Sequence, residues 1–205
     1  DQMAVHLPLS VEGQLEAEIL MTPTNNILSA TNGQLIIGPR QDITIGIYTL
    51  TMKHSGRNPR PQPLTFFNIY EVQQALLLHK VHAREDIFFV NGNKYYETTV
   101  GRVLIWEVMP KHAAITFDIV NRPITDKIAH SLLKLVRKHL GDQETVNLAE
   151  NIKRLGFDYA EKFGISIGLD DFPRVENVAN LKLDANKKQI EYELQYLDGL
   201  ITSQD

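Results

Sequence analysis

Histidine and carboxylate side chains come together at one place in this sequence, around residues 79–86. His79 and His82 stand three residues apart, and two carboxylates, Glu85 and Asp86, follow closely. At the end of a helix this spacing could bind a metal ion. The segment is expected to leave its helix there, however, so ordinary surface polar residues are the favoured interpretation.

A second candidate for acid–base chemistry is the neighbouring pair Asp170 and Asp171. Adjacent residues of an extended segment point to opposite faces, so these carboxylates are a poor catalytic pair. The sequence has no Gly-rich phosphate loop, no nucleophile-elbow motif and no His-Glu-x-x-His pair. It also has no cysteine, which excludes thiolate catalysis, disulfides and cysteine-ligated metal sites. From the residues alone we expect a domain without a self-contained active site.

Basic residues gather in two places where they could contact phosphate. A Pro/Gly/Arg-rich loop over 54–64 has no acid, and Lys127, Lys134, Arg137 and Lys138 lie on the polar side of a predicted helix. Solvated surface is the favoured interpretation of both. A nucleic-acid-binding domain stays as an alternative, although the net charge of −4 gives it little help.

The first quarter of the chain is predicted to consist of short elements and loops. Alternating apolar residues predict a strand over 2–9, and Ser10 is a plausible N-cap for a helix over 11–21. Turn-forming residues then predict loops around short extended pieces. Propensity alone favours a strand over 43–51, which is rich in Ile, Thr and Tyr.

The middle of the chain has clearer patterns. Residues 69–80 are helix-like, and an Asn-Gly pair between two β-rich runs predicts a hairpin over 86–98. Two amphipathic helices follow, the first with Thr125 as N-cap; Gly141 ends the first and Gly164 the second. The short link between them predicts an antiparallel pair. These elements together indicate an α+β fold of mixed helices and short strands.

The C-terminal stretch has a coiled-coil pattern. Ile190, Leu194, Leu197 and Ile201 are spaced by four, three and four residues, which is typical of a coiled-coil seam. Such a seam needs a partner helix, so we expect a truncated arm with Leu194 and Leu197 exposed, disordered or paired with another copy. No apolar run approaches the ~20 residues that a membrane span needs, and no membrane partner is expected.

Five segments in the same order resemble the largest catalytic subunit of multisubunit RNA polymerase, the bacterial β′ type. They are DQMAVH at the start, TNNILSATNGQLIIGPRQDITIGIYTLT, ETTVGRVLIWEVMP, LGFDYAEKFGISIGLDDF and LQYLDGLIT. Members commonly have Pro where Ala30 stands and Ser where Arg40 stands, which are minor departures. The resemblance spans nearly the whole chain, and it implies DNA-directed nucleotidyl transfer by the parent enzyme.

The resemblance also implies roles for particular residues. In the family, three aspartates hold the catalytic Mg²⁺, and Asp1 matches the third of them. One carboxylate cannot make a magnesium site by itself, so this chain is expected to be inactive alone. Gln2, Gln41 and Asp42 are implied as active-site support, with a helix cap as the equal alternative for Asp42. The segment after Asp42 is implied to be a helix, against its propensity.

The same resemblance implies a division of the chain and a set of partners. Residues 1–22 correspond to the tail of the catalytic domain, 23–172 to the pore domain, and 173–205 to the start of a funnel and helical arm. The implied partners are other polymerase subunits, DNA template, RNA, nucleoside triphosphates and factors at the secondary channel. The implied location is cytoplasmic and nucleoid-associated, with a plastid left open. A stand-alone, non-catalytic interaction module related to the channel domain is the alternative.

Overall fold

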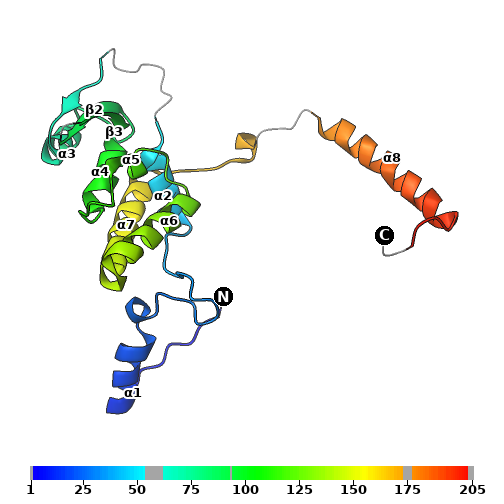
Figure 1. The fold of residues 1–205 in the computed structure, drawn as a ribbon, viewed down its shortest axis with the longest axis horizontal. Coiled ribbons are helices and arrows are strands. Elements are labelled where there is room, and N and C mark those ends of the chain that lie inside the picture. The colour runs from blue at the N-terminus through cyan, green and yellow to red at the C-terminus, as the bar shows by residue number, and fades with distance from the viewer. Residues whose placement is uncertain (1, 54–61, 93, 173–176, 203–205) are drawn as a thin grey trace. The chain divides into compact units, whose positions relative to one another are not determined.

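The structure is a computed structural model that describes residues 2–53, 62–92, 94–172 and 177–202 (Figure 1). Asp1 and most of the basic loop over 54–64 lie outside the described residues. The chain divides into two compact units, Asp1–Ile165 and Ser166–Asp205. The fold is α+β, as the sequence predicts, with eight α-helices and one three-stranded sheet in the part of the chain that the structure describes.

In chain order the elements are α1 Val11–Glu16, η1 Ala17–Met21, η2 Pro23–Asn25, α2 Asp42–Thr51, β1 Thr65–Phe66, α3 Ile69–Leu77, β2 Asp86–Asn91, β3 Lys94–Thr99, α4 Val100–Val108, α5 Phe117–Val120, α6 Asp126–Leu140, α7 Asp142–Phe163, η3 Leu169–Asp171 and α8 Val178–Leu197. Here η1 is a π-helix, and η2 and η3 are 3₁₀ helices. The predicted elements over 11–21, 69–80 and 86–98 are all present, with boundaries that differ by a few residues.

The sheet has the order β1-β2-β3. Strand β1 pairs in parallel with β2 through Thr65 opposite Phe88, and β2 pairs antiparallel with β3 through Asn91 opposite Lys94. The hairpin turn uses Gly92 at a φ of 61°, a value at which glycine has no Cβ penalty. The Asn-Gly signal in the sequence therefore located this turn correctly.

The core of the first unit is formed where α2, α4, α6 and α7 pack on one another and on the sheet (Figure 1). Its fully buried side chains include Leu50, Ile87, Val103, Phe117 and Leu133. Each such side chain contributes about 1.5–3 kcal/mol when it is removed from water. Helix α6 begins after Thr125 and ends at Gly141, as predicted, and α7 follows directly and packs against it.

Two predictions from local pattern are wrong. Residues 2–9 form no strand, and Met3 and Leu9 are about nine-tenths exposed, at 90% and 91%. A strand needs a neighbour to accept its backbone hydrogen bonds, and none of the described residues provides one. The segment 43–51 is the helix α2 rather than a strand, as the family resemblance implied, because Gly46, Ile47 and Leu50 make one buried helical face.

The second unit contains η3 and α8. None of the residues of α8 is buried, and Leu194 and Leu197 are 57% and 79% exposed, as expected for a seam without its partner. The seam prediction is wrong at Ile201, because α8 ends at Leu197. Gly199, with a φ of 72°, turns the chain there, and the backbone N–H of Leu200 donates to the carbonyl of Gln195 at 2.9 Å.

Candidate functional site

Two of the residues that the family resemblance implicates, Gln41 and Asp42, lie at the N-terminal end of α2. Gln41 occupies the N-cap position with φ 50° and ψ −125°, and its side chain makes no capping hydrogen bond. Such a backbone conformation is ordinarily taken by glycine, and in other residues it costs about 1–3 kcal/mol. Asp42 is the first residue of α2, so the alternative of Asp42 as the cap is wrong, and its charge favours the helix N-terminus instead.

The loop that leads into Gln41 is fixed by α6. At Gly38 an added Cβ would lie 2.3 Å from Nε2 of His130, so only glycine allows the ring to lie against the backbone there. His130 is itself held, since its Nδ1 lies 3.0 Å from the carbonyl oxygen of Asp126. Pro39, next to Gly38, is buried. The strained residue therefore follows a loop that packs closely against α6.

Helix α2 is held from behind by two backbone-to-backbone contacts. An added Cβ at Gly46 would lie 2.0 Å from the carbonyl oxygen of Gly156 on α7. An added Cβ at Gly101 on α4 would lie 2.1 Å from the carbonyl oxygen of Leu50 on α2. These close approaches set the position of α2 along its whole length, because neither neighbour can move as a flexible side chain could.

The segment Thr98-Thr99-Val100-Gly101-Arg102 is buried throughout. The side chain of Arg102 is in the core, where its Nε donates to the carbonyl of Thr51 at 3.0 Å and its Nη1 donates to Oδ1 of Asn121 at 3.1 Å. Burial lowers the pKa of the Arg102 guanidinium below its usual value. Arg102 thus closes the C-terminal end of α2, where the carbonyls lack helical partners.

In the sequence this segment contributes to the family resemblance, which implies no role for Arg102. A signal was present, because Arg102 is the single charged residue in the run Val100–Trp106. A charge inside an otherwise apolar helix is buried only when it is hydrogen-bonded, so a paired arginine could have been inferred.

The other candidate residues do not converge. Gln2 is exposed on the segment 2–9, and Asp1 lies outside the described residues. The backbone N–H of His82 donates to Oε2 of Glu85 at 3.0 Å, and Oδ2 of Asp171 accepts from Gly168 N–H at 2.7 Å. Among the described residues no three His, Asp or Glu side chains could hold a metal ion. The described donors therefore do not fit an octahedral magnesium shell by themselves.

The model of the family RNA polymerase Rpb1, domain 3, matches residues 26–172. The chain belongs to this family. The match includes α2 with Gln41 and Asp42 and the buried Arg102 segment.

Individual proteins match this chain over a longer range than the family model does, up to its whole length. The chain is 41% identical over 211 residues to the DNA-directed RNA polymerase subunit beta′ of Anaplasma marginale (strain Florida), which covers 98% of this chain and 15% of the relative. It is 40% identical to the same subunit of Anaplasma phagocytophilum (strain HZ) and of Ehrlichia ruminantium (strain Welgevonden), each over 100% of this chain and 15% of the relative. The resemblance to the bacterial β′ type is confirmed, and the chain spans about 15% of the length of these relatives.

None of the helices in the described ranges is long and apolar enough to cross a bilayer.

Proposed function

We propose that this chain is the channel-lining part of a β′ subunit in a DNA-dependent RNA polymerase, an enzyme that transcribes by nucleotidyl transfer. In this proposal residues 1–22 end the catalytic domain, 23–172 are the pore domain on the path of entering nucleoside triphosphates, and 173–205 begin the funnel. Asp1 contributes one ligand to the catalytic Mg²⁺, and the chain alone is inactive. The relatives named as DNA-directed RNA polymerase subunit beta′ are much longer proteins, and this chain covers 15% of their length.

The observation that carries the proposal is the strained backbone of Gln41. A glutamine at φ 50° is less stable than a glycine would be, and only a rigid surrounding keeps it there. Strain of this type gathers at functional sites, where a fixed side-chain direction outweighs the loss of stability. We infer that Gln41, Asp42 and Gln2 support the metal-binding loop.

Exposed apolar side chains of the first unit support a role inside a larger assembly. On α1 and η1, Val11, Leu15 and Leu20 are 77%, 56% and 65% exposed. Apolar surface of this extent ordinarily contacts another protein surface. The partners we propose are other polymerase subunits, together with the DNA template, RNA, nucleoside triphosphates and secondary-channel factors, in the cytoplasm.

The test uses a reconstituted polymerase whose β′ subunit contains these 205 residues. Asp1→Ala should abolish RNA extension, and Gln41→Ala should slow extension at saturating nucleotide, while both enzymes still assemble on gel filtration. The matched control is Gln74→Ala, which removes an exposed glutamine of α3 and should extend RNA at the normal rate. Normal extension by the Asp1→Ala enzyme would refute the proposal and favour a non-catalytic interaction module.

A further inference from the structure

A hollow of about 510 Å³ lies between the turn over 28–35 and the C-terminal half of α6. We name it the α6 pocket. Three residues of the turn, Gly33, Gln34 and Leu35, line one side of it. The other side is lined by Lys134, Arg137 and Lys138 of α6 and by Asp142 of α7. Its volume is within the range of sites that bind nucleotide-sized molecules.

The charges that line the α6 pocket are unbalanced. Asp142 is the only carboxylate among its lining residues, and its Oδ1 lies 2.7 Å from Nε of Arg137. Lys134 and Lys138 have no ionic or hydrogen-bonding side-chain partner among the residues that the structure describes, whereas Lys153 pairs with Glu150. Two ammonium groups are therefore left for an anion from solution.

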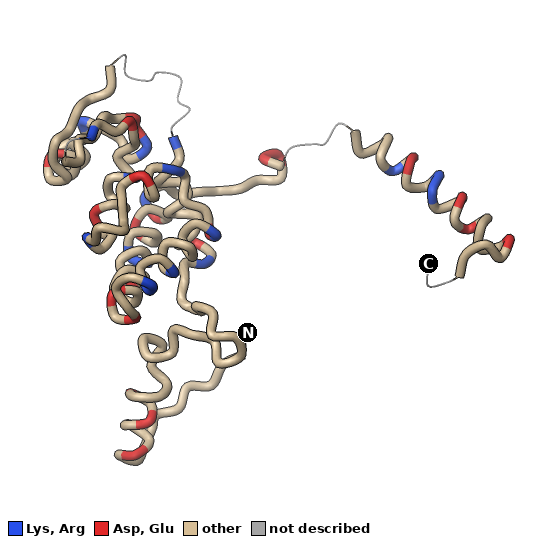
Figure 2. Tube along the Cα trace, viewed as in Figure 1, with Lys and Arg blue, Asp and Glu red and all other residues tan. Residues whose placement is uncertain are grey.

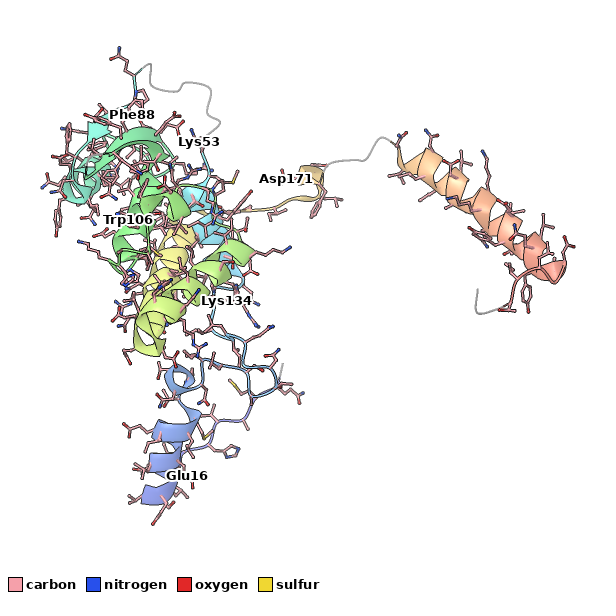
Figure 3. All side chains as sticks on the ribbon, viewed as in Figure 1. Glu16, Lys53, Phe88, Trp106, Lys134 and Asp171 are labelled. Atoms are coloured by element: carbon pink, nitrogen blue, oxygen red, sulfur yellow. The ribbon has the colours of Figure 1, made fainter. Side chains whose placement is uncertain are left out.

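The position of these two lysines suits a ligand with several phosphate groups. Lys134 and Lys138 are four residues apart on α6, so they lie on one face about 6 Å apart. Blue segments on α6 in Figure 2 mark all of its Lys and Arg residues, and Figure 3 labels Lys134. Cations in the last turn of a helix stabilise its dipole, which accounts for Lys138 and Arg137. Lys134 precedes that turn, and the helix dipole does not account for it.

The opposite side of the pocket is preformed. The backbone N–H of Ser29 donates to the carbonyl of Gln34 at 2.8 Å, and that of Gly33 donates to the carbonyl of Ser29 at 2.8 Å. Oδ1 of Asn32 accepts from the N–H of Gln34 at 3.0 Å, and Leu28 pairs with Leu35 in a β-bridge. A side that does not need to be ordered on binding leaves more of the interaction energy for affinity.

From these observations we propose that the α6 pocket binds the polyphosphate group of a nucleoside-triphosphate-sized anion. Lys134 and Lys138 contact the phosphate oxygens. Arg137 also contacts them when its ion pair with Asp142 opens. The inference goes beyond the role proposed above and does not depend on it, because it concerns binding by residues of α6 and needs no polymerase activity.

The experiment titrates the 205-residue chain by calorimetry with tripolyphosphate, ATP and adenosine in separate arms. Tripolyphosphate and ATP should each bind at one site, and adenosine should give no saturable heat. Lys134→Ala should weaken ATP binding about tenfold, as expected for one charge-assisted contact. Asp142→Asn should tighten it, because the carboxylate repels the ligand and occupies Arg137.

The matched control is Lys127→Ala, which removes the same charge from the same helix at an exposed position outside the pocket. This control should change the affinity for ATP less than twofold. Equal weakening by Lys127→Ala and Lys134→Ala would overturn the proposal in favour of a diffuse basic face. The absence of saturable tripolyphosphate binding by the folded wild-type chain, or binding of adenosine in its place, would also overturn it.

Discussion

The core of the first unit and helix α8 of the second have similar apolar side chains and opposite exposure. Leu133 on α6 and Leu148 on α7 are 0% and 1% exposed in the core, whereas Leu181 and Ile190 on α8 are 62% and 57% exposed. Both regions have helical periodicity in the sequence. The difference shows that periodicity defines an apolar face, while burial depends on whether the same chain provides the surface that covers it.

One residue reports on the core alone. Trp106, labelled in Figure 3, is the only tryptophan and packs against the core. Its ring lies 5.7 Å from that of Phe117 at 84°, an edge-to-face arrangement. Its fluorescence during denaturant unfolding therefore measures the free energy of unfolding of the core and leaves α8 silent.

Gly46→Ala should give the largest effect. Its Cβ would lie 2.0 Å from a backbone oxygen of Gly156, and a backbone group cannot turn aside as a side chain can. We expect the free energy of unfolding to fall by about 3 kcal/mol, at the upper end of overpacking costs.

The control for Gly46→Ala is Gly168→Ala in the second unit, where the nearest atom to the new Cβ is Oδ2 of Asp171 at 3.6 Å. That variant should leave the Trp106 transition in place. A Gly46→Ala chain as stable as the wild type would mean that α2 and α7 do not approach as closely as described.

Arg102→Met should rank second. The methionine keeps most of the apolar volume but leaves the carbonyl of Thr51 and the amide of Asn121 without their buried donor. We expect a loss of about 2 kcal/mol from two such unpaired groups. Arg102→Lys should recover part of it, since one ammonium can reach one of the two acceptors; equal losses for both variants would assign the effect to packing alone.

The sequence predicted local features of the fold correctly, and it failed where the structure depends on contacts between distant parts of the chain. Turn and cap signals act locally, and the hairpin at Gly92 and the helix ends at Gly141 and Gly164 were correct. Propensity failed over 43–51, because the close approach of Gly46 to Gly156 is a long-range contact that local pattern does not contain.

The candidate site was predictable only through the family resemblance. That resemblance pointed to Gln41 and Asp42, and the chain places both at the start of α2. The positive φ of Gln41 could not be expected from its residue type, since glutamine rarely adopts it. The apolar run around Arg102 indicates that this arginine is buried and paired, but its partners Thr51 and Asn121 are 51 and 19 residues away in the chain, so no local pattern could have named them.

Gln41→Gly should change stability in the opposite direction. Glycine takes the observed φ without a Cβ clash, and the relief of strain exceeds the extra flexibility of the unfolded chain. We expect the free energy of unfolding to rise by about 1 kcal/mol. Gln41→Ala keeps the strain and should leave stability near that of the wild type; a gain of the same size in both variants would show that the backbone at Gln41 is not strained.

Leu194→Ala should give the smallest effect, and it tests the comparison directly. Leu194 is 57% exposed on α8, so its truncation removes little buried surface and should change the free energy of unfolding by less than about 0.5 kcal/mol. The same substitution at Leu133, which is 0% exposed, should cost about 3 kcal/mol. If both variants lost equal stability in the Trp106 transition, exposure of the α8 seam would be wrong; if only Leu133→Ala did, the apolar face of α8 would contribute nothing to this core and would be left for a partner.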